Sequence, residues 1–281
     1  MKKLMFGMAA ALALCGMADI ESSNTVGYQT KELEAGKFAI AAIQFEGTDG
    51  SMDIGKLISG FSGVSYEEYG DAFVNVAPQL QVPNGVGYDI YYYLTDGWFD
   101  DGTEAGGSAA GWCDQFGVLA GKGAEVSGEL VPGVAMWVKS KTATEVYQQS
   151  GQVSEVGSIT IDVPATFALR ASFFPIAFNL NDATKVSFEG LVQASYEQYG
   201  DDFVSYASQL QVPNGVGYDI YYYLTDGWFD DGTEAGGSAA GWCDQFGVLA
   251  GKGAEVSGDV PAGQGFWAKG VGSTFKMTFK K

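Results

Sequence analysis

The sequence predicts an all-β protein made of two tandem antiparallel β-sandwich-like modules of about 130 residues each. Three observations lead to this prediction. Fifty consecutive residues, 79–128, recur without a change as residues 209–258, so one unit is used twice. Short runs rich in β-branched and aromatic residues alternate with turn signals, which is typical of strands. Forty-one glycines supply the tight turns that many short strands require.

The repeat extends beyond the identical block, which sets the expected boundaries. Residues 65–70 align with 195–200, and Met136-Trp137-Val138-Lys139 aligns with Phe266-Trp267-Ala268-Lys269. Both units have the size of one compact domain. Recent duplication and selection explain the identity of the central block equally well. We expect module 1 at residues 19–147 and module 2 at residues 148–281.

The first 18 residues are expected to be a signal peptide. They contain a charged start (Lys2-Lys3), an apolar run too short to span a bilayer permanently, and a small-x-small cleavage site ending at Ala18. A lipid anchor at Cys15 is the alternative, and the bulky Leu14 before it disfavours that alternative. We therefore predict a bacterial protein exported to the periplasm, the cell surface or the medium, with no membrane span in the mature chain.

The composition excludes several classes of function. Histidine is absent, which removes the usual general base, the Ser-His and Cys-His nucleophile pairs and most zinc sites. The formal net charge is −19, it becomes −21 when Lys2 and Lys3 leave with the signal, and Arg170 is the only arginine. Such a chain has no cluster of cations to replace phosphate counterions, so we expect no nucleic-acid partner. Glycans or other envelope proteins remain as expected partners.

Local patterns place the elements in order along the chain. Residues 39–45 and 158–163 are expected strands, bounded by turn residues. Residues 65–77 are the one expected helical segment, because Tyr66, Tyr69 and Phe73 lie at helical spacing and Pro78 follows. Asn84-Gly85 predicts a hairpin between residues 79–82 and 88–94. Asp96-Gly97 predicts a second, two-residue loop, which would complete a β-meander.

The expected meander gives residues 88–95 two different faces, since side chains alternate along a strand. Ile90, Tyr92 and Leu94 form an apolar face that is expected in the core. The opposite face gathers aromatic rings and carboxylates, which suit sugar binding because rings stack on a pyranose and carboxylates accept hydrogen bonds from its hydroxyl groups. The candidate ligand-binding residues are Asp89, Tyr91, Tyr93, Trp98, Asp100, Asp219, Tyr221, Tyr223, Trp228 and Asp230.

Two alternatives stay open for that face. Its rings can instead pack beneath a neighbouring strand or the sister module, and a register shift of one residue would exchange the faces. Asp89 and Asp100 are also the basis of an enzymatic hypothesis, a glycosidase that uses a carboxylate pair. We assign no catalytic residue, and we expect the protein not to be an enzyme.

Further acidic residues follow in a glycine-rich segment. Calcium binds six to eight oxygen atoms, often in such segments, so calcium is the one cofactor considered. The spacing does not fit an EF-hand, and surface acids of an anionic protein explain the cluster as well. The speculative calcium ligands are Asp96, Asp101, Glu104, Asp226, Asp231 and Glu234.

Cys113 and Cys243 occupy equivalent positions of the two modules. We expect both to be buried free thiols that pack like small apolar side chains beside Trp112 and Trp242. The alternative is a disulfide between the modules, which an oxidising compartment would allow.

The ends of the mature chain carry a resemblance. It opens with Ser23-Asn24-Thr25-Val26-Gly27-Tyr28, and residues 260–269 near its end read Val-Pro-Ala-Gly-Gln-Gly-Phe-Trp-Ala-Lys. This resembles a loosely defined group of uncharacterised bacterial secreted proteins built from Gly- and aromatic-rich β-modules, which start with Val-Gly-Tyr and end with Gly-x-Gly-Phe-Trp. Module 1 departs from the closing pattern, having Gly133-Val134-Ala135-Met136 there.

The resemblance implies no activity. We predict an exported, non-catalytic structural or adhesive protein, and a carbohydrate-binding protein is the alternative.

Overall fold

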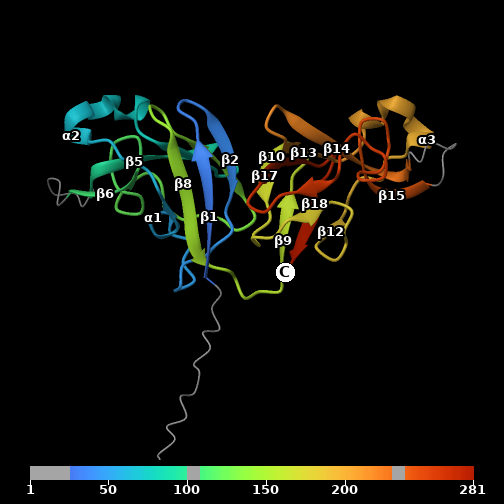
Figure 1. Cartoon of the computed structure of the whole chain (residues 1–281), viewed down its shortest axis with the longest axis horizontal. Coiled ribbons are helices and arrows are strands. Elements are labelled where there is room, and N and C mark those ends of the chain that lie inside the picture. The colour runs from blue at the N-terminus through green and yellow to red at the C-terminus, as the bar shows by residue number, and fades with distance from the viewer. Residues whose placement is uncertain (1–25, 100–107, 230–237) are drawn as a thin grey trace, which may run out of the picture.

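A computed structural model of the protein describes residues 26–99, 108–229 and 238–281. The expected signal peptide therefore lies outside the described residues. The fold is all-β, as predicted, with antiparallel sheets and a few short helices. The two halves of the chain lie side by side (Figure 1), and within the described residues each sheet takes its strands from one half only. None of the helices in these ranges combines the length and the apolarity needed to cross a bilayer.

The first half contains a five-stranded sheet in the order β2-β7-β4-β5-β6 and a three-stranded sheet in the order β1-β8-β3. The two sheets enclose a common core that includes Leu80, Tyr91, Trp112 and Tyr147. The strands are β1 (Val26–Leu33), β2 (Phe38–Ala42), β3 (Ile58–Ser59), β4 (Gln79–Pro83), β5 (Tyr88–Trp98), β6 (Ser108–Cys113), β7 (Ala135–Lys139) and β8 (Glu145–Gln152), with the short helices α1 (Ile54–Leu57) and α2 (Tyr66–Tyr69) and the 3₁₀ helix η1 (Gly70–Asn75).

The second half repeats this plan. Its five-stranded sheet has the order β10-β17-β13-β14-β15, its three-stranded sheet the order β12-β18-β9, and a short pair joins β11 to β16. The elements are β9 (Ser158–Val163), β10 (Ala168–Ala171), β11 (Phe178–Asn179), β12 (Val186–Glu189), β13 (Gln209–Pro213), β14 (Tyr218–Trp228), β15 (Ser238–Cys243), β16 (Asp259–Val260), β17 (Gly265–Lys269) and β18 (Phe275–Lys280), with α3 (Tyr196–Tyr199) and the 3₁₀ helix η2 (Gly200–Ser205).

The expected boundary after Tyr147 falls inside a strand. All eight residues of β8 pair with β1, ending at Gln152 opposite Val26. The first half therefore extends to Gln152, and residues 153–157 connect it to β9.

The hairpin at Asn84-Gly85 is confirmed. Strands β4 and β5 pair antiparallel, with Pro83 opposite Tyr88. The Asn84 side chain accepts hydrogen bonds from the backbone N–H groups of Val86 (3.2 Å) and Gly87 (2.8 Å), which closes the turn. Gly85 has φ +91°, a conformation that side chains disfavour, so glycine is required there.

The second expected loop, at Asp96-Gly97, is wrong. The chain does not turn there: β5 continues to Trp98 through a β-bulge between Leu94 and Gly97, and Gly97 pairs with Ala109 of β6. The backbone is held extended from both sides, because Thr95 N donates to Val64 O (3.0 Å) and Trp98 N donates to Gly117 O (3.1 Å). These long-range hydrogen bonds replace the local turn that Asp-Gly favours.

Both faces of β5 are covered. One face points into the core between the sheets, and the other carries Tyr92 and Leu94 into a second, smaller core with Phe73 from η1. The expected helical segment is thus confirmed as α2 followed by η1, and its role is to cover the outer face of the sheet. The second half has the same arrangement, with Phe203 of η2 packed on Tyr222 at 5.5 Å.

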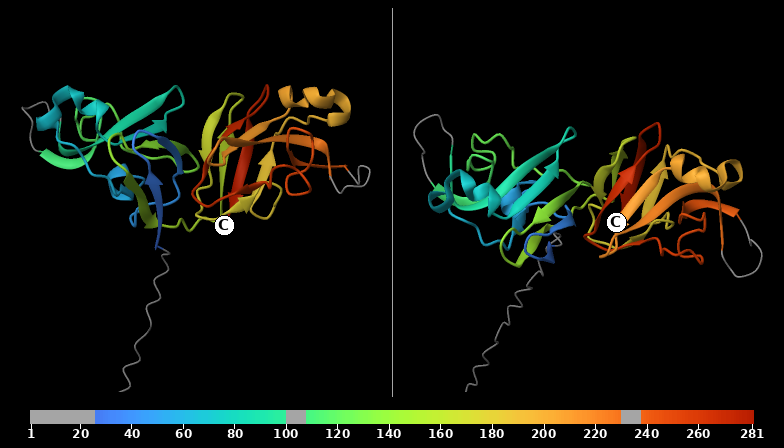
Figure 2. Two further views of the ribbon diagram at one scale, coloured as in Figure 1. Left: turned by 45° about the horizontal axis from the view of Figure 1, so that its top comes forward. Right: turned by 90° about the horizontal axis from the view of Figure 1, so that it is seen from above.

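An approximate twofold relation joins the halves. The buried Gln44 amide donates across the junction to Phe174 O at 2.9 Å. Two further hydrogen bonds are nearly reciprocal, from Ala42 N to Gly263 O (3.2 Å) and from Ala171 N to Gly133 O (3.0 Å). Reciprocal contacts of this kind form across such an axis, so the copies face each other instead of following head to tail. The two halves meet through β2 and β7 on one side and β10 and β17 on the other, at one edge of each five-stranded sheet, and Figure 2 shows the two halves from two further sides.

Gly97 and its copy Gly227 allow the bulged strand to pack closely. A methyl group on Gly97 would overlap the Cys113 Sγ and lie 3.2 Å from a Leu119 methyl group. We predict that Gly97→Ala combined with Gly227→Ala lowers the free energy of unfolding by about 1–3 kcal/mol per site, because overpacking forces neighbours apart. Urea unfolding followed by tryptophan fluorescence measures the change.

The matched control is Gly87→Ala combined with Gly217→Ala, where the nearest atoms, the Asn84 and Asn214 side-chain oxygens, lie 4.0 Å away. Equal midpoints for both double variants would contradict the close packing around the bulge.

Candidate functional site

The aromatic face expected to bind sugar is buried. Tyr91 and its copy Tyr221 are both 0 % exposed and belong to the cores between the sheets. Tyr93 is half-buried and packs edge-on against Trp112 at 5.1 Å, and Tyr223 packs on Trp242 at 5.6 Å. The expected exposure of these tyrosines is therefore wrong, because the three-stranded sheet covers them.

Trp98 does not share a face with Tyr91 and Tyr93. The bulge after Leu94 breaks the alternation, so Trp98 lies on the helix side of the sheet and packs against Tyr66 of α2 at 4.1 Å. Trp228 packs in the same way on Tyr196 at 4.2 Å. These tryptophans hold the covering helices, so the expected grouping with the two tyrosines is wrong.

Asp89 and Asp219 remain accessible. Each is half-buried and lines a pocket of about 230 Å³ near the start of its strand, β5 or β14, beside Tyr88 or Tyr218. The Asp89 carboxylate accepts a hydrogen bond from the Asn84 amide at 2.7 Å, as Asp219 does from Asn214. A role in ligand binding stays a prediction for these two. Asp100 and Asp230 lie outside the described residues, and with them the carboxylate pair of the glycosidase hypothesis.

Asp96 and Asp226, two of the speculative calcium ligands, have another role. The Asp96 carboxylate accepts hydrogen bonds from Ser65 Oγ (2.6 Å), Tyr66 N (2.5 Å) and Glu67 N (3.0 Å), and so caps the start of α2 from the neighbouring strand. Asp226 caps α3 in the same way. Within the described ranges, no three acidic or sulfur side chains gather as metal ligands. The remaining speculative ligands, Asp101, Glu104, Asp231 and Glu234, lie outside those ranges.

The electrostatics of this cap follow from its hydrogen bonds. Burial alone would raise the pKa of Asp96, but the donors from Glu67, Ser65 and Tyr66 outweigh it and lower the pKa below its usual value. The pKa of Asp226 is lowered for the same reasons. Three donors aimed at one carboxylate favour its charged form.

A different group of aromatic side chains is exposed, where the halves meet. Trp137 of β7 and Trp267 of β17 lie 6.1 Å apart. Phe38 packs edge-on against Trp137 at 5.8 Å, and Phe167 against Trp267 at 6.4 Å. We call Phe38, Trp137, Trp267 and Phe167 the aromatic row. Its two outer rings are 44 % and 42 % exposed.

A lysine lies over each end of the aromatic row. The Lys139 ammonium is 4.6 Å from the centroid of the Phe38 ring, and the Lys269 ammonium is 5.3 Å from that of Phe167. Both are cation–π contacts. Each half therefore contributes a phenylalanine, a tryptophan and a lysine, and the two tryptophans meet in the middle.

Both halves make this trio although their strand registers differ. In the first half Phe38 pairs with Lys139 and Ile40 with Trp137. In the second half Leu169 pairs with Trp267, which shifts the register by one residue relative to the repeat. The phenylalanine is displaced by one residue as well: the repeat offset of 130 would place the counterpart of Phe38 at position 168, but it stands at position 167. Phe167 therefore lies beside Lys269, as Phe38 lies beside Lys139.

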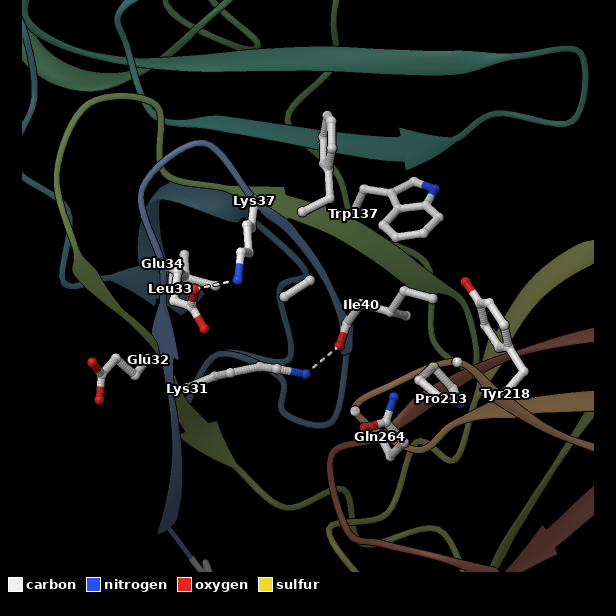
Figure 3. A pocket seen from close by; sticks show the side chains of 14 residues that line it. Lys31, Glu32, Leu33, Glu34, Lys37, Ile40, Trp137, Pro213, Tyr218 and Gln264 are labelled. Carbon is white, nitrogen blue, oxygen red and sulfur yellow. Dashed lines mark hydrogen bonds and ion pairs between the residues drawn. The ribbon is translucent and has the colours of Figure 1, made fainter.

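Phe38 and Trp137, the first-half rings of the aromatic row, line a cleft of about 410 Å³ between the halves (Figure 3). Lys31 and Lys37 reach into it from β1 and the turn before β2, and Tyr218 and Gln264 come from the second half. Lys37 forms an ion pair with Glu34, and the Lys31 ammonium donates to Ile40 O at 2.9 Å. Burial lowers the pKa of Lys31. The cleft thus combines open aromatic rings with polar groups from both halves.

Reasoning from the sequence missed the aromatic row. One signal pointed to it: the Trp and the Lys of Met136-Trp137-Val138-Lys139 return in Phe266-Trp267-Ala268-Lys269, in a part of the repeat where the intervening residues have changed. Phe38 and Phe167 carry no such signal, because they are not equivalent positions.

Comparison with known proteins finds no match: no family model fits the sequence, and no curated protein or solved structure is significantly similar to it. The resemblance to secreted β-module proteins therefore stays a prediction. The site has to be interpreted from its own geometry.

The caps by Asp96 and Asp226 predict a pH-dependent stability. A lowered pKa in the folded state stabilises the protein above the unfolded pKa of about 4, and this contribution disappears as the pH falls through the folded value. We predict that Asp96→Asn with Asp226→Asn costs about 1 kcal/mol per site at pH 7, typical of a lost cap, and much less at pH 3. Thermal unfolding at both pH values measures the difference.

Glu67→Gln with Glu197→Gln is the control, since these exposed acids lie in the same helices. A deficit of the Asp variant that is as large at pH 3 as at pH 7 would contradict the charged cap.

The cysteines are free and buried, as expected. They lie near opposite ends of the molecule, in β6 and β15 (Figure 1). Burial raises the pKa of each thiol to about 12, with nearby carboxylates adding to the shift. Because the thiolate is the reactive form, both groups are expected to be inert in the folded protein.

We predict that a thiol reagent such as DTNB at pH 8 labels neither Cys113 nor Cys243 in the native protein and labels both in 6 M guanidinium chloride. Absorbance and intact mass count the labels. Rapid labelling of the native protein would show that the strands covering these thiols open readily.

Proposed function

We propose that the protein is an exported, non-catalytic adhesive protein that binds glycans through the aromatic row. The observation that carries the proposal is the pair of Phe-Trp-Lys trios, built once by each half and meeting at the junction. Export rests on the expected signal peptide. The absence of histidine supports a binding role in preference to acid–base catalysis.

Packing between the halves explains only the inner part of the row. Trp137 and Trp267 are half-buried and pack on a small apolar cluster that includes Ile40 and Leu169. Phe38 and Phe167 lie outside this cluster and leave more than 40 % of their surface open to solvent. Exposed large apolar groups in a contiguous patch mark interaction sites.

The geometry favours a single polysaccharide chain over a flat surface. Neighbouring rings are inclined to each other by 71°, 59° and 83° along the row, so they do not form one plane. A chain whose sugar rings turn relative to each other can place an apolar C–H face on successive aromatic rings. Hydroxyl groups of the chain would meet Gln264 and Glu34 in the cleft.

A structural role without a ligand is the second candidate. The buried hydrogen bond from Gln44 to Phe174 and the meeting of Trp137 with Trp267 support it, because they bind the halves together with no ligand. The two candidates differ in whether the outer rings have a function.

A glycan array probed with the mature protein tests the proposal. We predict binding to at least one polysaccharide, and a loss of affinity of about tenfold or more in Phe38→Ala with Phe167→Ala, since each aromatic contact contributes roughly 0.5–1.5 kcal/mol beyond its buried area. The outer rings are largely exposed, so the thermal midpoint should stay within a few degrees.

The control is Tyr28→Ala with Tyr206→Ala, which removes one exposed ring per half that is not part of the row; these rings are 75 % and 48 % exposed. Binding equal to that of the unchanged protein is expected. If the unchanged protein binds no glycan on the array, the structural role replaces the proposal.

A further inference from the structure

We infer that the glycan bound by the aromatic row is an acidic polysaccharide, whose carboxylates pair with Lys139 and Lys269. The inference rests on the proposed function and specifies its ligand. It starts from the two ammonium groups at the ends of the row, which lie 4.6 Å and 5.3 Å from the outer ring centroids.

Neither ammonium group has an acidic partner within residues 26–99, 108–229 and 238–281. Among the described residues only two ion pairs form, Lys37 with Glu34 and Lys56 with Asp49, and no hydrogen bond from Lys139 or Lys269 is found there. The chain holds 34 acidic residues and 15 basic ones, so an acidic partner would be easy to supply. Two ammonium groups that lie over aromatic rings, in equivalent places of both halves, leave their charge available to a ligand.

The other basic groups of the cleft do not compete for that role. Lys37 forms an ion pair with Glu34, and the half-buried Lys31 donates to the Ile40 carbonyl. The charge offered to a ligand along the row therefore comes from its two ends. A chain of uronic acids that covers the row can place one carboxylate near each ammonium group, with its apolar sugar faces on the rings between them.

The net charge of the whole protein does not prevent this. At physiological ionic strength, charges are screened beyond about 8–10 Å, so a ligand responds mainly to the groups around the row. Lowering the salt concentration strengthens both the ion pairs between the lysines and the ligand and the repulsion between the ligand and the distant acidic residues of the protein. The contribution of the lysines is therefore measured best as a difference between an acidic polymer and its neutral counterpart.

The experiment compares polymers with the same backbone and different charge. The mature protein is titrated by calorimetry with oligomers of polygalacturonate and their methyl esters, of β-1,4-glucuronan and cellulose, and of polymannuronate and mannan, at 50 mM and 500 mM NaCl. We expect at least one acidic oligomer to bind about tenfold more tightly than its neutral counterpart at 50 mM NaCl, the sum of two exposed ion pairs. This preference should fall toward unity at 500 mM.

Two double variants separate charge from stacking. Lys139→Gln with Lys269→Gln should bind the acidic and the neutral member of the pair equally, while Phe38→Ala with Phe167→Ala should weaken both. Lys122→Gln with Lys252→Gln is the matched control, because these exposed lysines occupy equivalent positions in the loops after β6 and β15. The control should keep the full preference for the acidic oligomer. Thermal midpoints verify that all variants fold.

The possible results separate the preference for acidic glycans from glycan binding itself. Neutral oligomers that bind as tightly as the acidic ones in every pair overturn the inference and leave the glycan-binding function standing. A preference for acidic oligomers that survives in the Lys139→Gln, Lys269→Gln variant also overturns it, since the carboxylates of the ligand then bind to other residues. If no oligomer of either kind binds, the proposed function fails and the inference fails with it.

Discussion

The junction of the two halves is the constraint on which the arrangement of this protein depends. The two five-stranded sheets contact each other near one edge, where the outer faces of β2 and β7 pack on those of β10 and β17. Small residues at this contact, such as Ala42, Ala135 and Ala171, allow a close approach. Glycine extends this close contact, since a Cβ at Gly265 would overlap both Ala135 and Ile40. The approximate twofold relation then brings equivalent strands together and places Trp137 against Trp267.

The same sheets are covered differently at their other ends. Beyond β4 and β13, the outer face is closed by α2 and α3 with their 3₁₀ helices, and Asp96 or Asp226 ties each helix to the sheet through its cap. Long strands such as β5 are thereby buried on both faces, which explains why their aromatic residues serve packing. The aromatic row lies on the part of the outer face next to the junction, where Phe38 and Phe167 stay more than 40 % exposed.

Two copies of one unit therefore give a site that neither copy contains alone. Each half supplies one Phe-Trp-Lys trio, and the row of four rings exists only because the halves face each other. The smaller pockets at Asp89 and Asp219 behave in the opposite way, since each is complete within one half. A duplicated chain can thus carry both doubled sites and a single shared one. The shared site has mixed character, with half-buried tryptophans at its centre and an exposed phenylalanine beside a lysine at each end.

The sequence by itself determined the all-β class, the doubled architecture, the hairpin at Asn84-Gly85, the helical segment after Ser65 and the buried cysteines. These features depend on local periodicity, on turn chemistry or on composition, which neighbouring residues carry. Only the tertiary structure decided that Asp96-Gly97 bulges instead of turning, because the strand donates hydrogen bonds to the Val64 and Gly117 carbonyls and is held extended by them. That bulge also placed Trp98 on the helix side. The candidate site was beyond the reach of the sequence, since Phe38 and Phe167 occupy different positions of the repeat and become equivalent only through a shifted register and the packing of one half on the other.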